Sequence, residues 1–309
     1  MDPRVIRIVG AISLTTMIVG CGSGAAPSAP AADGPTQPAP SADTTLVADI
    51  DVGGRTIHLV CLGPTDTGRP TVVFEHGLGG DSGQWADVIT EIATTDRGCS
   101  YDRAGAGMSE PATGPRTTAD QVEDLRTALQ KAGVAPPYLL VGHSIGGWNA
   151  LVHDGMYPAD VVGAVLVDVR PPEASARWLA ALPPEAADES EAIRGNREEF
   201  TTFETDPTRN PETLDLSASA AQAAEADLGD DPIVVLVASR GKDDFWAGLE
   251  PALATTMDEI WMELQQDLAD RSTNGTIEMV EGATHDVPGD RPDAIVDAIR
   301  SVLAQLAAG

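Results

Sequence analysis

One stretch decides the fold that this sequence predicts: Tyr138-Leu-Leu-Val-Gly-His-Ser144-Ile-Gly-Gly-Trp-Asn149. Its first four residues suit a buried strand, the pattern Gly142-x-Ser144-x-Gly146 follows, and a segment compatible with a helix comes next. A serine on so tight a strand-to-helix turn has a strained backbone, and glycine is required on both sides because larger side chains would collide. The stretch therefore predicts a nucleophilic serine at the end of a strand.

Chance is the alternative explanation, because a chain with 31 glycines meets the five-residue pattern easily. The flanks argue against chance, since a strand precedes the turn and a helix follows it, in the order that the turn requires. The first turn of that helix would also direct free N–H groups at the serine. There they can stabilise negative charge that develops during nucleophilic attack.

Strands and helices alternate on both sides of this turn. Short apolar runs between turn signals predict a hairpin of strands at 46–52 and 56–62, and further strands at 71–75, 99–102, 161–167, 233–238 and 276–280. Helices are expected at 85–94 and 118–132, from the serine turn to residue 157, and at 292–306. This alternation indicates a mostly parallel sheet with helices on both faces and functional groups at the carboxyl ends of its strands.

Residues 170–230 break the alternation. The segment is rich in Pro, Ala and acidic residues, lies between two core strands, and has helix-favouring pieces at 173–181, 189–203 and 217–227. We expect a small helical lid, because insertions at the carboxyl edge of a strand usually hang over the site. The alternative is a solvent-exposed insertion of no consequence.

Four motifs resemble those of the α/β-hydrolase superfamily, and the resemblance spans about residues 45–306. The motifs are an oxyanion loop His76-Gly-Leu-Gly-Gly80, a fourth-strand signature Tyr101-Asp-Arg-Ala-Gly-Ala-Gly-Met-Ser109, the nucleophile elbow Gly142-His-Ser-Ile-Gly146 and a histidine loop Gly282-Ala-Thr-His-Asp286. The resemblance implies an α/β-hydrolase fold, with a mostly parallel sheet of eight strands, helices on both faces and right-handed crossovers.

A serine hydroxyl is a poor nucleophile near neutral pH, so Ser144 needs a base, and the base needs an acid that anchors it. The resemblance implies the chain order serine, acid, histidine, which makes His285 the base. The loop that carries His285 follows a predicted strand and precedes the last helix. The other histidines are expected to have structural roles: His58, His76, His143 and His153.

The identity of the triad acid is open between Asp168 and Asp243. Superfamily members usually place the acid after the strand predicted here at 233–238, which favours Asp243, or less well Asp244, whereas others place it one strand earlier. We predict Asp168, because it directly follows a buried strand, where a carboxylate is costly unless a partner such as the His285 ring N–H takes its charge. Asp243 is the alternative acid, in a segment that reads as a charged, solvated turn.

The resemblance also implies two backbone donors for an oxyanion hole. One is the N–H of Ile145, directly after the serine, and the other is the N–H of Leu78, in the glycine-rich loop 76–80. Loss of one such donor typically raises the barrier by about 3 kcal/mol. These turns are therefore expected to matter nearly as much as the triad.

The first 44 residues are expected to lie outside the folded domain, which is assigned to 45–309. Residues 1–20 combine early arginines with an apolar run that is too short for a stable membrane span, as in a signal peptide. The run ends in Ile-Val-Gly-Cys21, which resembles the lipobox of bacterial lipoproteins, in which the cysteine is lipidated. The alternative is an ordinary secretory signal. Residues 21–44 would then be the lipidated cysteine and a disordered tether, and the protein would be exported and anchored to the outer face of the cell membrane.

Cys61 and Cys99 are the cysteines left for the folded domain. Disulfides persist in exported proteins, and the resemblance implies a sheet order in which the second and fourth strands, which carry these cysteines, are neighbours. We therefore predict a Cys61–Cys99 disulfide. The alternative is two buried free thiols.

Charge and composition exclude several classes of partner. A formal net charge of −29 repels phosphate backbones, so no nucleic acid is expected. The sequence has no Cys-x-x-Cys or His-x-x-x-His pair and no glycine-rich nucleotide fingerprint, so neither a metal nor another cofactor is expected. The epoxide-hydrolase and dehalogenase branches of the superfamily are disfavoured, because the resemblance to them would need aspartate in place of Ser144.

Together these features predict a lipid-anchored extracytoplasmic serine hydrolase. It would cleave a carboxylic ester of a small molecule through an acyl-serine intermediate. The superfamily also includes amidases, peptidases and acyltransferases, which could use the same triad. The alternative from another class is a non-catalytic binding protein of the same fold.

Overall fold

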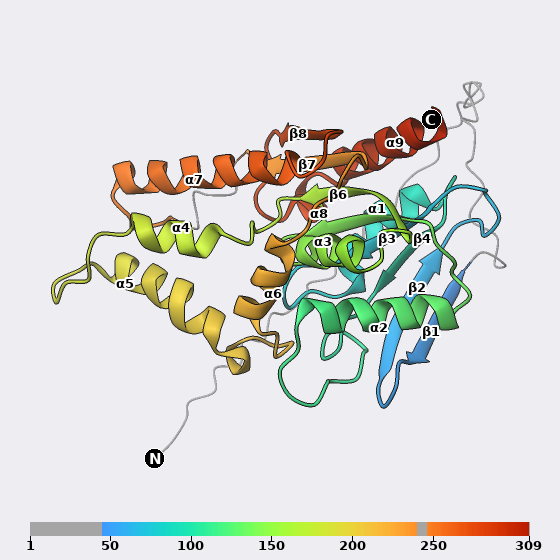
Figure 1. Cartoon of the computed structure of the whole chain (residues 1–309), viewed down its shortest axis with the longest axis horizontal. Coiled ribbons are helices and arrows are strands. Elements are labelled where there is room, and N and C mark those ends of the chain that lie inside the picture. The colour runs from blue at the N-terminus through green and yellow to red at the C-terminus, as the bar shows by residue number, and fades with distance from the viewer. Residues whose placement is uncertain (1–44, 240–245, 309) are drawn as a thin grey trace, which may run out of the picture. The chain divides into compact units, whose positions relative to one another are not determined.

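The sheet is the framework of the domain (Figure 1). The computed structural model describes residues 45–239 and 246–308, and within these residues eight strands form one sheet in the order β1-β2-β4-β3-β5-β6-β7-β8. The strands are β1 Leu46–Asp51, β2 Thr56–Leu62, β3 Thr71–Glu75, β4 Gly98–Tyr101, β5 Tyr138–His143, β6 Val161–Val167, β7 Ile233–Ala238 and β8 Gly275–Val280. Strand β2 runs antiparallel to β1 and β4, and the other neighbours are parallel. The predicted mostly parallel, eight-stranded sheet is confirmed.

Several sequence-based predictions concern residues outside the described ranges. They are the signal peptide, the tether and lipidation of Cys21, which fall within residues 1–44, and the alternative acids Asp243 and Asp244. These predictions stay predictions below.

The burial of each strand follows from its place in the sheet. All residues of β3, β5 and β7 are buried, as is typical of parallel strands that are covered on both faces and read as continuous apolar runs. The edge strand β1 instead alternates half-buried with exposed residues. The central strands are therefore buried up to their carboxyl ends, and the loops that follow them come close together at that edge of the sheet.

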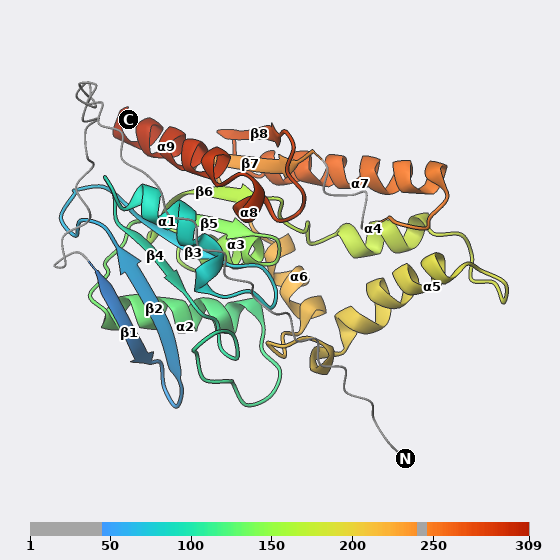
Figure 2. The ribbon, with the colours of Figure 1, turned by 180° about the vertical axis from the view of Figure 1, so that it is seen from behind.

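Helices cover both faces of the sheet, as the view from behind also shows (Figure 2). One face packs against α1 Ala86–Ile92, α8 Val287–Asp290 and α9 Pro292–Ala308, and the other against α2 Thr118–Lys131, α3 Gly146–Met156 and α7 Pro251–Ala269. Successive residues of a strand point to opposite faces. In β3, for example, Val72 and Phe74 join the first layer of helices, and Val73 joins the second.

Residues 170–230, called the cap insertion below, lie between β6 and β7. They form α4 Ala174–Ala181, α5 Glu191–Glu198, the π-helical turn η3 Glu199–Phe203, η4 Pro207–Arg209 and α6 Leu216–Ala224. Trp178 of α4 contacts Phe200, Trp246 and Trp261, with ring centroids 5.0–5.8 Å apart. The segment is thus helical, and this aromatic cluster joins it to α7. Its service as a lid stays a prediction.

Helix α7 is an element that the sequence analysis did not predict. Its buried residues recur at helical spacing and include Met257, Ile260, Trp261, Leu264 and Leu268. Pro251 stands in its first turn, where the missing N–H leaves no hydrogen bond unmade. This periodicity is a sufficient signal for a helix. None of the helices among the described residues is both long enough and apolar enough to cross a membrane.

The predicted disulfide joins β2 to β4. Cys61 and Cys99 are direct partners in the antiparallel pairing of these strands, their Cα atoms are 4.0 Å apart, and their sulfur atoms are bonded. Both side chains are fully buried in the hydrophobic core. The pairing depends on the sheet order, because β3 lies between these strands in sequence but not in space.

We predict that the double variant Cys61→Ala, Cys99→Ala has a free energy of unfolding about 2–4 kcal/mol below that of the parent protein, because the bond spans 38 residues and restricts the unfolded chain. Guanidinium denaturation measures the difference. Thiol titration of the denatured, unreduced parent should find at most one thiol per chain, that of Cys21. Two or more thiols would contradict the pairing.

Candidate active site

Ser144 stands on the turn between β5 and α3. Its φ is +54°, in the left-handed region that non-glycine residues rarely adopt, at a cost on the order of 1 kcal/mol. The turn is held from both sides, since the Ser144 N–H donates to the Val167 carbonyl at the end of β6 (3.1 Å) and the Gly147 N–H donates to the Ser144 carbonyl (3.1 Å). The half-buried serine side chain is thereby presented at the carboxyl edge of the sheet.

The glycines on both sides of Ser144 are required by close contacts. A Cβ atom on Gly142 would lie 2.6 Å from the carbonyl oxygen of Gly146. A Cβ atom on Gly146 would lie 2.3 Å from the carbonyl oxygen of Glu75, at the end of β3. The steric reason given from the sequence for both glycines therefore agrees with the packing of the turn.

His285 and Asp168 continue from Ser144 in a hydrogen-bonded row. The Nε2 atom of His285 lies 3.0 Å from the Ser144 Oγ atom, and its Nδ1 atom lies 2.7 Å from the Asp168 Oδ2 atom. Since a carboxylate accepts, Nδ1 carries the proton, and Nε2 is left as the acceptor for the serine hydroxyl. The arrangement can remove the serine proton as the hydroxyl attacks an electrophile.

Asp168 is held rigidly under the histidine. It is fully buried and has a φ of +39°, its N–H donates to the Leu236 carbonyl (2.7 Å), and its Oδ1 atom accepts from the Ala238 N–H (3.0 Å). Both carboxylate oxygens therefore have a donor, which offsets the cost of burying the charge. Of the two acids considered from the sequence, Asp168 contacts His285, and Asp243 lies outside the described residues.

His143 contributes hydrogen bonds as well as packing. Its Nε2 atom lies 2.7 Å from the main-chain carbonyl oxygen of His285, so Nε2 carries the proton and donates, and its Nδ1 atom accepts from the Gln84 side-chain amide (3.1 Å). Burial, with a smaller contribution from the neighbouring His285, lowers the pKa of His143 to about 4. The ring is therefore neutral at physiological pH and supports the backbone of the histidine loop.

Gln84 is a site residue that the sequence analysis missed. It lies in the short helix η2 Ser82–Trp85, and its Oε1 atom accepts from the Gly77 N–H (2.9 Å) while its amide nitrogen contacts His143. Gln84 thus connects the loop 76–80 with the loop of His285. No local motif marks a glutamine for this position, and its partner His143 lies 59 positions away in the sequence.

The two predicted oxyanion donors lie in the loops expected for them. Ile145 is buried at the start of α3, directly after Ser144, and Leu78 is half-buried in the loop 76–80. Within the described part of the chain, neither backbone N–H donates a hydrogen bond to another protein group. Both donors thus remain available to a ligand at Ser144, and their role in an oxyanion hole stays a prediction.

The remaining histidines have structural surroundings. His76 is buried, its Nε2 atom accepts from the Arg103 N–H (3.3 Å), its Nδ1 atom donates to the Gly77 carbonyl (2.8 Å), and burial lowers its pKa to about 3. His58 on β2 contacts Asp49 at 2.7 Å. His153 on α3 is buried, with its ring edge-on to Tyr157.

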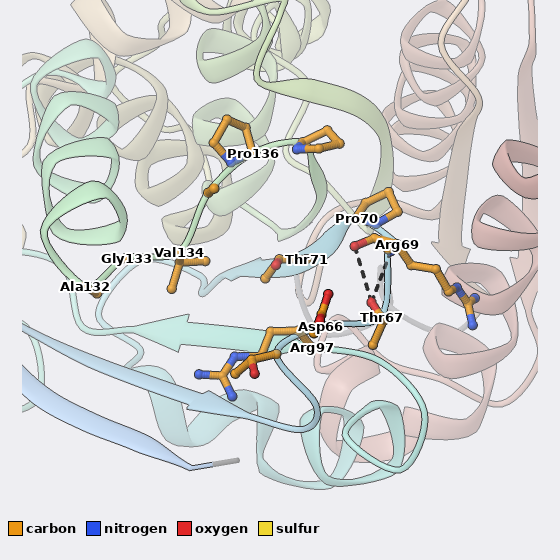
Figure 3. Close-up of a pocket in the computed structure, with 14 residues that line it drawn as sticks. Asp66, Thr67, Arg69, Pro70, Thr71, Arg97, Ala132, Gly133, Val134 and Pro136 are labelled. Atoms are coloured by element: carbon orange, nitrogen blue, oxygen red, sulfur yellow. Dashed lines mark hydrogen bonds between the residues drawn. The ribbon is translucent and has the colours of Figure 1, made fainter. Parts of the chain in front are cut away.

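Ser144 lines neither of two cavities in the described part of the chain. The one in Figure 3, of about 460 Å³, is lined by residues such as Thr67, Arg69, Thr71, Val134 and Pro136, which precede or begin β3 and β5 at the amino edge of the sheet. Ser144 follows a strand at the opposite edge, so this cavity does not belong to the site. A second cavity, of about 240 Å³, lies between the cap insertion and Trp246, and Arg170, Trp178 and Phe200 are among its lining residues. No cluster of three or more His, Cys, Asp or Glu side chains in the described ranges could hold a metal ion.

Comparisons with known sequences agree with this geometry. A sequence model of the alpha/beta hydrolase family matches residues 72–298. The chain is 26% identical over 239 residues to the uncharacterized protein YqjL of Bacillus subtilis (strain 168), across 75% of this chain and 83% of that protein. It is 38% identical over 127 residues to the probable transporter efuK of Hormonema carpetanum, across 38% of this chain but 18% of the transporter.

Solved structures share the fold. A thermophilic esterase from Thermogutta terrifontis, with malate bound, superposes with a TM-score of 0.56 at 20% identity, across 84% of this chain and 98% of the esterase. A loop variant of the haloalkane dehalogenase DbeA from Bradyrhizobium elkanii superposes with a TM-score of 0.61 at 18% identity, across 85% of this chain and 98% of that chain. At these identities the likeness concerns the fold and not the reaction.

We predict that Asp168→Asn lowers kcat on an activated ester by up to about 10⁴-fold, because an amide in place of the carboxylate favours the wrong tautomer of His285. Asp243→Asn is the matched comparison, and each variant is checked for folding by circular dichroism. A collapse of the rate in Asp243→Asn, together with a change of only a few-fold in Asp168→Asn, would transfer the acid role to Asp243.

Proposed function

Because this chain belongs to the alpha/beta hydrolase family, we propose that it is a serine hydrolase that cleaves a carboxylic ester through an acyl-serine intermediate. The observation that carries the proposal is the row of Ser144, His285 and Asp168, joined by contacts of 3.0 and 2.7 Å. Nucleophile, base and anchoring acid stand in the order and geometry that acyl transfer needs.

In the first half of the proposed reaction, the Ser144 Oγ atom attacks the ester carbonyl and its proton moves to His285 Nε2. Asp168 stabilises the imidazolium that forms, and the N–H groups of Leu78 and Ile145 stabilise the tetrahedral oxyanion. Collapse of this intermediate breaks the bond to the leaving alcohol, which takes the proton from His285 and departs. An acyl-serine ester remains.

In the second half, water takes the place of the alcohol. His285 Nε2 removes a proton from the water as its oxygen attacks the acyl-serine carbonyl, and the same donors stabilise the second oxyanion. The proton then returns to the Ser144 Oγ atom as the carboxylic acid leaves. The cycle uses only side chains and backbone groups of this chain, and needs no redox partner.

The structural neighbours include an esterase and a dehalogenase, so the shared fold does not decide the reaction. Serine at position 144 favours acyl transfer, since the resemblance to the dehalogenase branch would need aspartate there. Amide hydrolysis, peptide hydrolysis and acyl transfer to another acceptor use the same chemistry. A binding protein of this fold would have no need for the contacts that join Ser144, His285 and Asp168.

We predict that a fluorophosphonate probe forms one covalent adduct, on Ser144, in the folded protein. Ser144→Ala and the heat-denatured parent are the controls, and peptide mass spectrometry locates the adduct. A panel of p-nitrophenyl esters of graded chain length then measures kcat/KM for each acyl group. Absence of an adduct on Ser144 in folded protein would favour the binding-protein alternative.

We further propose that the enzyme is exported and held at the outer face of the cell membrane by lipid on Cys21. The support is the sequence alone, namely the apolar run of residues 1–20 and the lipobox-like ending before Cys21. A tether rich in Ala, Pro, Gly and Ser between the anchor and the domain would let the active site reorient toward small ester substrates. One acyl chain binds membranes only marginally, so we expect more than one chain on this cysteine.

We predict that Cys21→Ser moves the protein from the membrane fraction to the soluble fraction without a change in kcat or KM, because the tether separates the anchor from the site. Fractionation followed by an ester assay of both fractions measures this. Loss of activity in the soluble form would place the anchor or tether inside the mechanism. Unchanged membrane association would contradict lipidation at this residue.

A further inference from the structure

A buried ion pair joins the cap insertion to the loop after β4. The Arg103 guanidinium contacts both carboxylate oxygens of Glu212, with Nε 2.6 Å from Oε2 and Nη2 2.8 Å from Oε1. Arg103 is 1% exposed and Glu212 is 2% exposed. Burial by itself would lower the pKa of Arg103, but the charge and hydrogen bonds of Glu212, together with the charges of Tyr101 and Glu75, outweigh this effect. The net pKa is raised, so the guanidinium stays charged. Because the bidentate contact fixes the plane of the guanidinium, it also fixes the direction in which the remaining N–H groups of Arg103 point.

Those other donors hold the loop 76–80. Arg103 Nη1 donates to the His76 carbonyl (2.6 Å), and Nη2 donates to the Gly77 carbonyl (2.8 Å). On the far side of Leu78, the Gly79 N–H donates to Oε1 of Glu212 (2.9 Å). The ion pair therefore contacts the residues on both sides of Leu78, whose own N–H is one of the proposed oxyanion donors.

The planar peptide bond links the orientation of the Gly77 carbonyl to that of the Leu78 N–H. The Gly77 carbonyl and the Leu78 N–H belong to one planar trans peptide, in which C=O and N–H point in opposite directions. Three donors converge on that carbonyl oxygen: Arg103 Nη2 at 2.8 Å, His76 Nδ1 at 2.8 Å and the Gly80 N–H at 3.1 Å. An oxygen that is held in this way turns the N–H away from Arg103, and the nearby positive charge polarises the whole peptide unit.

We propose that Arg103 and Glu212 are positioning residues that aim and polarise the Leu78 N–H, so that the cap insertion directly sets the strength of the oxyanion hole. The proposal rests on the serine hydrolase function proposed above. Neither side chain touches the reacting atoms in this scheme. Both act through the peptide between Gly77 and Leu78.

The segment that carries Glu212 is itself fixed to the loop before α2. The Asn210 side chain makes two hydrogen bonds with the backbone of Leu214 (2.8 and 2.9 Å), and the Arg116 backbone pairs with residues 213 and 215 (3.0 and 2.7 Å). Pro211 packs on the loop, since a Cβ atom on Gly79 would lie 3.2 Å from its Cγ atom. A displacement of this part of the insertion would therefore also displace the oxyanion loop.

The test uses Glu212→Gln in the full-length protein, a change that keeps the shape of the side chain and removes its charge. We expect kcat to fall about 10- to 100-fold, because a misaligned donor should cost no more than the roughly 100-fold or greater loss that removal of a whole oxyanion donor causes. KM should stay within about threefold. A trifluoromethyl ketone analogue of the ester forms a tetrahedral oxyanion with Ser144. Its affinity should fall by the same factor as kcat/KM, while the affinity of the alcohol product should not change.

Glu173→Gln is the control for the loss of an acidic charge from an Arg–Glu pair. The Arg271–Glu173 contact of 3.1 Å does not involve loop 76–80, and Glu173 is more exposed than Glu212. If Glu212→Gln does not fold, Glu212→Asp keeps the charge and withdraws it from Gly79, and the same loss of ketone affinity is expected. Active-site titration with the fluorophosphonate normalises each rate to folded protein. An effect of Glu212→Gln no larger than that of Glu173→Gln, or an equal loss of ketone and alcohol affinity, would overturn the inference.

The two proposals fail in different ways. If the parent protein forms no fluorophosphonate adduct and hydrolyses no ester, the serine hydrolase function is wrong, and this inference falls with it. If the parent is labelled and active but Glu212→Gln behaves as Glu173→Gln does, the function stands and only the role of the ion pair is rejected.

Discussion

The close approach of helix α3 to the ends of its neighbouring strands is the constraint on which the rest of the site depends. A Cβ atom on Gly146 would lie 2.3 Å from the Glu75 carbonyl oxygen, and one on Gly147 would lie 2.1 Å from a methyl group of Val169. These contacts bring the loops after β3, β5 and β6 together around Ser144. The strained backbone of Ser144 is tolerated because these neighbours over-determine its position.

A polar layer under the oxyanion loop adds a second constraint. Glu75 accepts from the Tyr101 hydroxyl (2.7 Å) and the Asn149 amide (2.9 Å), and burial raises its pKa to about 7. Arg103 lies between Glu75 (3.7 Å) and Glu212 (2.6 Å). Buried charges destabilise a fold unless they are paired and hydrogen-bonded, so each member of this layer constrains the next. The layer thereby limits the positions that loop 76–80 can take. This suits the proposed role of the Leu78 N–H, which has to be oriented before an oxyanion forms.

Local sequence determined the elements and their order. Glycine spacing predicted the turn at Ser144, and apolar runs predicted the strands, because turn sterics and side-chain periodicity act within a few residues. The resemblance then supplied the sheet order that makes Cys61 and Cys99 neighbours, a pairing that the structure contains. The omission of α7 was a failure to apply the same periodicity between Pro251 and Ala269, and not a limit of the sequence.

Tertiary structure decided between the partners that the sequence left open, and it brought together side chains that no local pattern connects. Asp168 contacts His285 across 117 positions, and Arg103 contacts Glu212 across 109. Gln84 bridges Gly77 and His143 from a short helix without any recognisable motif. Nothing local distinguishes the carboxylate of Glu212 from the many other acidic residues of this chain. Glu212 meets Arg103 because the cap insertion packs against the loop after β4, and this packing joins segments that lie far apart in the sequence.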